Sequence, residues 1–202
     1  MMSEPDIRRV VEAIRLAETK TSGEIFCVVA HASGSYRLVP VAWAALLALC
    51  VPLVLITATS WPAGTIYLLQ LVTFIAAAAI LSLPAIRFRI VPKQALHRRA
   101  HIEATRQFLA QGLHLTERRT GVLIFASIAE RYAEIVADAG INAKVQAEYW
   151  DGVIFAMLAA IKADRPADGF VAAVERCGVI LAQHFPPGSI NRDELPNKVV
   201  FM

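Results

Sequence analysis

Acidic side chains stand at the ends of two predicted strands, where they could approach each other and bind a cation. Glu24 begins an apolar run that extends to Ala30, and Asp138 ends another that starts at Tyr132. A hard divalent cation such as Ca²⁺ needs several converging oxygens, and this pair supplies at most two carboxylates besides backbone carbonyls. Glu24 and Asp138 are therefore the candidate metal ligands. The alternative is a pair of solvated carboxylates at strand ends.

The other ends of the predicted strands carry a second polar set. Ligands of open α/β sheets bind beyond the carboxyl ends of the strands, where His31 and Ser33 follow the first strand and Ser127 and Glu130 follow the second. Ser127 lacks the Gly-x-Ser-x-Gly context of a hydrolase nucleophile, and the chain has no phosphate loop and no dinucleotide fingerprint. The sequence therefore assigns no catalytic residue.

The segment from Gly140 to Trp150 offers a different kind of site. Asn142, Lys144, Tyr149 and Trp150 lie beside the start of a predicted helix. The free N–H groups at a helix N-terminus favour an anion. These four residues are the candidate contacts to an anionic ligand or a partner, and the alternative is an ordinary polar surface loop.

Two histidines have the spacing of zinc ligands on a helix. His97 and His101 are four residues apart, so a helix places both on one face. Arg98 and Arg99 lie between them and would repel a cation, and no Glu follows His97 as it does in the metalloprotease motif. Contact with anionic lipid headgroups explains this basic segment better.

A stretch without charge interrupts the polar sequence. Residues 38–86 contain no charged side chain and no histidine. They are too many for one membrane span and enough for two, roughly Leu38–Thr59 and Thr65–Ile86, because about 22 helical residues cover roughly 33 Å. A Trp-Pro-Ala-Gly turn joins the two spans. The alternative is a long helical hairpin buried in a soluble core.

Basic residues follow this predicted hairpin within reach of lipid headgroups. They are Arg87, Arg89, Lys93, Arg98 and Arg99. The turn between the spans is uncharged, so the positive-inside rule places both flanks and both termini in the cytoplasm. We therefore expect a multi-pass membrane protein whose five basic residues contact anionic headgroups.

The composition agrees with a chain that lies partly in lipid. Hydrophobic residues make up 56% of the 202 residues, more than a soluble domain usually contains. The net charge of +3 comes without a basic–aromatic motif, so nucleic acid is not an expected partner. The N-terminal segment is charged throughout and is not expected to be a signal peptide. Three cysteines without a Cys-x-x-Cys pair predict neither a disulfide framework nor a zinc knuckle.

The remaining sequence alternates helical and strand patterns. Apolar runs predict strands at Glu24–Ala30, Gly121–Ser127 and Tyr132–Asp138. The first two should be parallel, because a long crossover joins them, and the last two antiparallel, because their connection is tight. Helices are expected from a capping box at Ser3 and Asp6 to about Thr19, and at residues 93–111, 150–161 and 166–185.

These elements define an α/β fold, a small mixed sheet flanked by helices and interrupted by a transmembrane α-helical hairpin. Residues 1–37 and 87–190 would form one discontinuous domain around the inserted hairpin, residues 38–86. Residues 191–202 would form a C-terminal tail.

Several segments of the chain resemble the TPM-domain family. They are Thr21–Ile25 (TSGEI), Thr120–Ser127 (TGVLIFAS), Glu130–Arg131 and Asp138–Ile141 (DAGI). Phe108–Leu113 (FLAQGL) and His184–Pro187 (HFPP) are similar to a bacterial membrane branch of that family, in which two transmembrane helices interrupt the domain. The resemblance covers roughly residues 5–200.

The resemblance implies a TPM-like sandwich of a small sheet and helices. Family members are described as membrane-associated or extracytoplasmic modules. Some relate to photosystem repair with an acid phosphatase activity, some act as receptor accessory factors, and some bind divalent metal through acidic loops. This chain departs from the usual member in having no predicted signal peptide and in placing its domain in the cytoplasm. That departure puts the extracytoplasmic roles in doubt.

We therefore predict a membrane-anchored interaction or accessory module of the bacterial inner membrane, without catalysis, that assists the assembly or maintenance of a membrane complex. Its expected partners are the lipid bilayer and a membrane protein, with a homo-oligomer as a further option. The alternative is an acid-phosphatase-like enzyme that depends on Ca²⁺ or another divalent cation. Transport is disfavoured, because neither predicted span carries an acidic, basic or histidine side chain.

Overall fold

The structure is a computed structural model that describes residues 2–146, 148–187 and 194–202. Two compact units make up the chain. Residues 1–33 and 97–202 form the first, which we call the sheet unit, and residues 34–96 form the second, which we call the helical unit.

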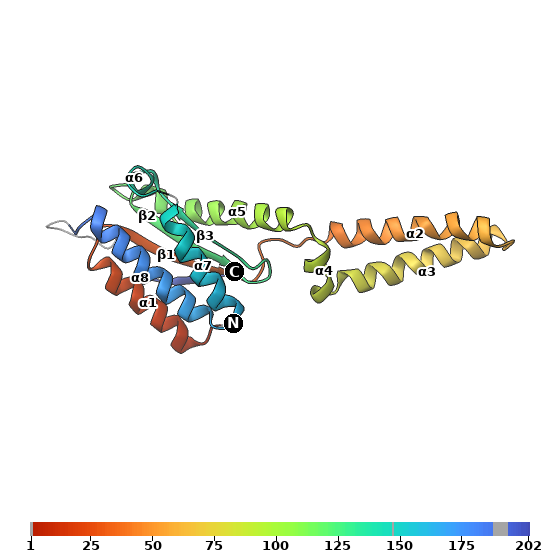
Figure 1. Cartoon of the computed structure of the whole chain (residues 1–202), viewed down its shortest axis with the longest axis horizontal. Coiled ribbons are helices and arrows are strands. Elements are labelled where there is room, and N and C mark those ends of the chain that lie inside the picture. Colours follow the sequence, from red (N-terminus) through yellow and green to blue (C-terminus); the bar gives the residue numbers. More distant parts are fainter. Residues whose placement is uncertain (1, 147, 188–193) are drawn as a thin grey trace. The chain divides into compact units, whose positions relative to one another are not determined.

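A four-stranded mixed sheet, with strand order β3-β2-β1-β4, is the centre of the sheet unit (Figure 1). Its strands are β1 (Glu24–Ala30), β2 (Gly121–Ser127), β3 (Tyr132–Ala137) and β4 (Val199–Phe201). β1 and β2 run parallel, and β2 and β3 run antiparallel. The predicted α/β class and mixed sheet are confirmed.

β4 is a strand that the sequence did not predict, within the segment expected to be a tail. It pairs parallel to β1, with Cys27 opposite Val199. Two further backbone hydrogen bonds extend the pairing, from His31 N to Met202 O at 2.7 Å and from Met202 N to Val29 O at 3.1 Å. Three residues are too few to show a strand period, so this strand is specified by the edge of β1 against which it lies.

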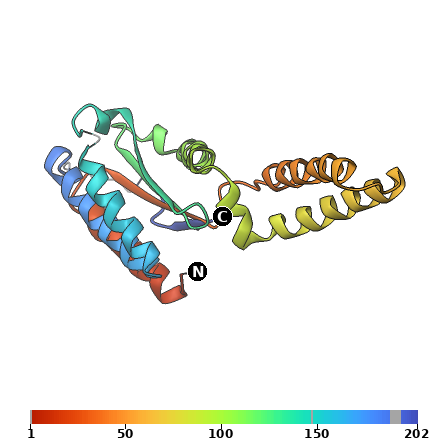
Figure 2. The ribbon, with the colours of Figure 1, turned by 45° about the vertical axis from the view of Figure 1, so that its right-hand side comes forward.

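Helices cover both faces of the sheet (Figure 2). α1 (Glu4–Glu18), α7 (Glu148–Lys162) and α8 (Pro166–His184) pack on one face, and α5 (Lys93–Ala110) packs on the other. Alternate residues of each strand point to opposite faces. Ile25, Cys27 and Val29 therefore join the core under the three helices, whereas Phe26 and Val28 join Ala100, Ala104 and Phe108 of α5.

The predicted capping box starts α1. Ser3 Oγ accepts a hydrogen bond from Asp6 N at 3.4 Å, and Asp6 Oδ2 accepts one from Ser3 N at 3.2 Å. These bonds satisfy donors that a helix N-terminus leaves free. The hydrogen bonds from Ser3 also hold the pKa of Asp6 below its ordinary value.

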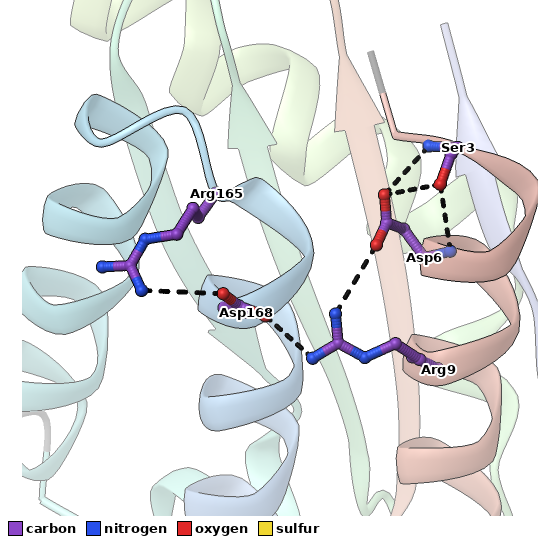
Figure 3. Close-up of polar contacts among 5 residues, drawn as sticks. All are labelled: Ser3, Asp6, Arg9, Arg165 and Asp168. Carbon is purple, nitrogen blue, oxygen red and sulfur yellow. Dashed lines mark hydrogen bonds and ion pairs between the residues drawn. The ribbon is translucent and has the colours of Figure 1, made fainter.

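Arg9 connects this helix start to α8 (Figure 3). Its Nη2 donates to Asp168 Oδ1 at 2.8 Å, and its Nη1 lies 3.5 Å from Asp6 Oδ1. Arg165 Nη1 lies 3.8 Å from the other carboxylate oxygen of Asp168. The side chains are largely exposed, so the network orients the two helices and adds little stability.

Two short elements refine the predicted boundaries near the sheet. The predicted turn at Ala139–Gly140 is the first turn of a short helix, α6 (Ala139–Asn142), and Asp138 is its N-cap rather than the last strand residue. A 3₁₀ turn, η1 (Leu113–Leu115), follows α5 after Gly112, whose φ of 75° is left-handed. The predicted helix end at this glycine agrees with that conformation.

The helical unit contains α2 (Leu38–Ala58), α3 (Ala63–Ser82) and α4 (Pro84–Ile90). α2 and α3 pack against each other, and both are long and apolar enough to cross a membrane by length and composition. The second helix was expected to continue to Ile86, but it ends at Ser82 and Pro84 begins α4. Proline lacks the N–H that would continue the helix, and its ring clashes with the preceding turn.

Candidate functional site

Glu130 is buried at the carboxyl ends of the two parallel strands. Its Oε2 accepts a short hydrogen bond from Ser127 Oγ, and its Oε1 accepts one from Ser33 N at 2.8 Å. The β1–β2 register places Ala30 opposite Ser127, so the segment after β1 and the turn after β2 meet at this carboxylate. The structure thus brings together Ser33, Ser127 and Glu130, three of the four residues expected at the carboxyl ends of these strands.

This arrangement joins the segment after β1 to the turn after β2, and its serine is closed to solvent. Ser127 is completely buried, so its hydroxyl cannot reach a substrate from solvent. His31, the fourth residue expected here, is exposed, and its backbone N–H is engaged with Met202 O. A serine nucleophile needs an accessible hydroxyl and a base that can take its proton.

Glu24 and Asp138 lie at the opposite end of the strands, one on each side of Gly121. Glu24 is opposite Gly121 in the register, and Asp138 N donates to Gly121 O at 3.0 Å. One strand therefore separates the two acids, which puts their Cα atoms roughly 10 Å apart. A shared ion would need both side chains to extend across Gly121.

Each of these carboxylates already accepts backbone hydrogen bonds. Glu24 accepts from Glu194 N at 3.2 Å and from Leu195 N at 3.3 Å. Asp138 Oδ1 accepts from Ala139 N at 2.7 Å, and Arg119 Nη1 lies 4.0 Å from the same oxygen. Asp138 Oδ2 is buried and has no hydrogen-bond partner among the residues that the structure describes. Over those residues, no group of three or more His, Cys, Asp or Glu side chains could hold a metal ion.

Gly140 explains how Asp138 is held in place. A Cβ at this position would lie 2.6 Å from the carbonyl oxygens of both Arg118 and Arg119. Gly140 N also donates to Arg119 O at 3.1 Å, and Arg119 has a left-handed φ of 55°. Only glycine lets α6 approach this loop so closely, and that approach sets Asp138 against the guanidinium of Arg119.

The four residues predicted to contact an anionic ligand have separate surroundings. Asn142 Nδ2 donates to Ala137 O at 2.8 Å, and Lys144 Nζ lies 4.7 Å from the centroid of the Phe185 ring. Trp150 is buried in the core under the helices, where its Nε1 has no hydrogen-bond partner among the described residues, and Tyr149 is exposed. The ligand contact of these residues stays a prediction.

Tyr149 lines a shallow groove on the outer side of the helix layer. The groove between α7 and α8 has a volume of about 350 Å³, and a neighbouring one between α1 and α8 has about 540 Å³. Glu175 and Val179 of α8 line both grooves. Gly152 lies in the first groove, where a Cβ would meet no atom within 4 Å.

His101 belongs to a polar cluster that the sequence did not predict. His101 Nδ1 lies 2.8 Å from Glu134 Oε1, and Tyr132 OH donates to Glu134 Oε2 at 2.8 Å. The His97 ring centroid is 5.2 Å from that of Tyr132. Burial, followed by the hydrogen bond to Glu134, raises the pKa of Tyr132. Tyr132 and Glu134 are two residues apart in β3, so their side chains lie on one face of the strand. This spacing was the sequence signal that could have predicted their contact with the two histidines.

The predicted headgroup-binding residues are divided between the two units. Arg87, Arg89 and Lys93 belong to the helical unit, and Arg98 and Arg99 belong to α5 in the sheet unit. Arg98 and Arg99 are both exposed. Their contact with lipid stays a prediction.

Comparisons with known proteins show a similarity to one domain family. Residues 84–180 match the family model of the TPM domain. The chain is also similar to the NMR structure of the BA42 protein from the psychrophilic bacterium Bizionia argentinensis, with a TM-score of 0.62 and 21% sequence identity over 100% of this chain and 96% of that one. At this identity the likeness concerns the fold alone. The comparison with curated proteins gives no match.

Proposed function

Because residues 84–180 carry a TPM domain, we propose that the protein is a membrane-anchored interaction module that assists the assembly or maintenance of a membrane complex without catalysing a reaction. The exposed apolar surface of α2 and α3 carries this proposal. Only 17% of an 18-residue apolar stretch of α2 is buried, and only 6% of the corresponding stretch of α3. A helical hairpin in a soluble core would be covered by other side chains, so the exposure of this one supports a cover of lipid or of a membrane partner.

The proposal includes an orientation in the bacterial inner membrane. The turn between α2 and α3 is uncharged, whereas Arg37 precedes the hairpin and Arg87, Arg89 and Lys93 follow it. Basic residues that flank a span favour the cytoplasmic side. The sheet unit and both termini would then lie in the cytoplasm, on one side of the bilayer.

The internal use of the buried acids supports a role without catalysis. Glu130 holds Ser127 and the backbone of Ser33, and Glu24 holds the backbone before β4. Hydrogen bonds of this kind position chain segments, and each leaves less of the carboxylate available to act on a substrate.

Reporter fusions and membrane extraction test the anchor. Fusions at Ser33 and at Leu115 should both report the cytoplasm, and the full chain should stay in the membrane fraction after carbonate washing. Reporters in different compartments, or a chain that washes off at alkaline pH, would contradict the proposal.

Crosslinking in intact membranes followed by detergent extraction tests the partner. A membrane protein should be enriched with the full chain and should be absent when α2 and α3 are replaced by an unrelated two-helix hairpin. If the two preparations retain identical proteins, the interaction role fails in the form proposed here.

A divalent-metal-dependent phosphatase is the second candidate, and the unpartnered Asp138 Oδ2 favours it. A buried carboxylate oxygen without a donor among the described residues could coordinate a cation. Glu24, one strand away at the same end of the sheet, would be the second acidic ligand. Hydrolysis of a phosphomonoester should then require Ca²⁺ or another divalent cation and should disappear in both Asp138→Ala and Glu24→Ala. Turnover that is absent, or unchanged in these variants, would remove this candidate.

A further inference from the structure

The helical unit has an aromatic contact at the base of its hairpin, and an arginine lies over one of the two rings. Tyr36 and Phe88 meet edge to face, with ring centroids 5.8 Å apart and planes at 73°. In the sequence, Arg37 follows Tyr36, Arg87 precedes Phe88 and Arg89 follows it. We call these five residues the arginine–aromatic foot.

The backbone before α2 has an uncommon conformation at the tyrosine of this contact. Tyr36 has a φ of 42°, a backbone conformation that residues other than glycine rarely adopt. A Cβ at Gly34 would lie 3.3 Å from the Tyr36 ring, closer than ordinary packing. A side chain at position 34 would therefore crowd the tyrosine ring.

Arg87 has a donor that the described protein does not satisfy. Its guanidinium carbon lies 5.0 Å from the centroid of the Phe88 ring, and its Nε is buried without a hydrogen-bond partner among the described residues. Buried donors almost always have an acceptor, and those on a charged group need one most. Residues 34–96 contain no Asp or Glu, so the helical unit itself offers no carboxylate.

The charge of the helical unit indicates the missing acceptor. Arg37, Arg87, Arg89 and Lys93 give it four positive charges with no acidic side chain. A guanidinium matches the geometry of a phosphate and can donate two parallel hydrogen bonds to it. The foot adjoins the first residue of an apolar helix, and aromatic rings favour the level of the headgroups. A lipid phosphate fits this position better than a phosphate free in solution.

We propose that the arginine–aromatic foot binds the phosphate of an anionic phospholipid headgroup, with the Arg87 guanidinium as donor and the Phe88 ring behind it. Arg37 and Arg89 add attraction for the negative charge. The site rests on the proposed membrane anchor and makes it selective, because it distinguishes an anionic lipid from a zwitterionic one.

Native mass spectrometry of the full chain in neutral detergent tests the site. Phosphatidylglycerol or phosphatidylcholine is titrated in, and retained lipid is counted. Wild-type protein should retain phosphatidylglycerol preferentially, and Arg87→Gln should weaken that retention about fivefold. Arg87→Lys keeps the charge but loses the planar guanidinium, so it should also lose much of the preference. Arg8→Gln, which removes one exposed charge from α1, should behave like wild type.

Two results would overturn the site. Equal retention by Arg87→Lys and wild type would mean that diffuse charge, and not a built guanidinium site, attracts the lipid. Competition by inorganic phosphate at concentrations similar to those of the lipid would mean that the site binds a free anion. Carbonate extraction of Arg87→Lys separates this test from the anchor itself: a variant that stays in the membrane but loses lipid preference supports the site, and loss of wild-type protein from the membrane removes the anchor and the site together.

Discussion

Glycine at position 140 decides where the acidic residue before it can lie. Asp138 caps α6, and α6 approaches the loop at Arg118 and Arg119 so closely that a side chain has no room. The same acid was proposed as a metal ligand from its place at a strand end. Its position therefore depends on a backbone contact that its own chemistry does not reveal.

Gly140→Ala should destabilise the sheet unit by about 1–3 kcal/mol, because a Cβ 2.6 Å from two backbone carbonyl oxygens forces the loop to shift. Thermal unfolding of the purified protein measures the effect. Gly152→Ala is the matched control: a Cβ there meets nothing within 4 Å, and better helix propensity should raise stability by up to about 1 kcal/mol. Equal stability of Gly140→Ala and wild type would show that the loop can move away from the added Cβ without a cost in stability.

Tyr132 predicts a change of stability at alkaline pH. Burial and the hydrogen bond to Glu134 raise its pKa in the folded state, whereas the unfolded chain releases this proton near pH 10. The stabilisation is therefore complete below about pH 10 and is lost as the pH rises above it. Tyr132→Phe removes this titration, so its melting temperature should fall less than that of wild type between about pH 9 and pH 11.

Below pH 10 the same variant should be less stable than wild type, because the hydrogen bond to Glu134 is gone. Tyr149→Phe, which changes an exposed tyrosine of α7, is the control and should follow the wild-type profile. If the melting temperatures of Tyr132→Phe and wild type fell by the same amount between about pH 9 and pH 11, the raised pKa of Tyr132 would be contradicted.

Among the elements, β4 has an importance out of proportion to its three residues. β1 is buried along its whole length and reads EIFCVVA, and β4 covers the edge that β2 leaves free. An uncovered apolar edge strand pairs readily with other chains. The short strand thus covers an apolar edge of the sheet.

Removal of residues 199–202 should expose this edge and produce oligomers or aggregates of the detergent-solubilised protein, visible by size-exclusion chromatography. Phe201→Thr is the control, because it keeps a strand-forming residue at a position that is already exposed in part. A truncated chain that elutes like wild type would show that β1 does not need this cover.

At the scale of the whole molecule, the chain combines a sheet unit with buried polar clamps and a helical unit whose apolar side chains face outward. Two helices of the second unit are long and apolar enough to cross a membrane by length and composition. The exposed apolar surface of these helices motivates the proposed anchor.

Leu53→Arg should lower the fraction of protein that resists carbonate extraction. Leu53 is 70% exposed on α2. An arginine there costs up to about 2.5–3.5 kcal/mol of insertion free energy, which is the cost at the centre of a span. Leu115→Arg, at an exposed position of the sheet unit, should leave membrane retention unchanged. If Leu53→Arg remains fully in the membrane fraction, α2 does not lie in lipid.

The sequence by itself determined the elements whose signals are local. The capping box at Ser3, the strand Gly121–Ser127 and the uncharged stretch over residues 38–86 are each written in adjacent or periodically spaced residues. Hydrophobic period, turn chemistry and span length act over a few turns or one strand, so they can be read without the fold. The mixed sheet followed, because the lengths of its connections restrict strand direction.

Only the tertiary structure decided which polar groups meet. Glu130 binds the backbone of Ser33 across 97 residues of sequence, and Glu24 binds that of Glu194 across 170. β4 forms because the edge of β1 offers hydrogen bonds to a segment with no strong pattern of its own. Such contacts depend on which surfaces packing brings together, and hydrogen bonds between distant residues leave no periodic signal in the chain.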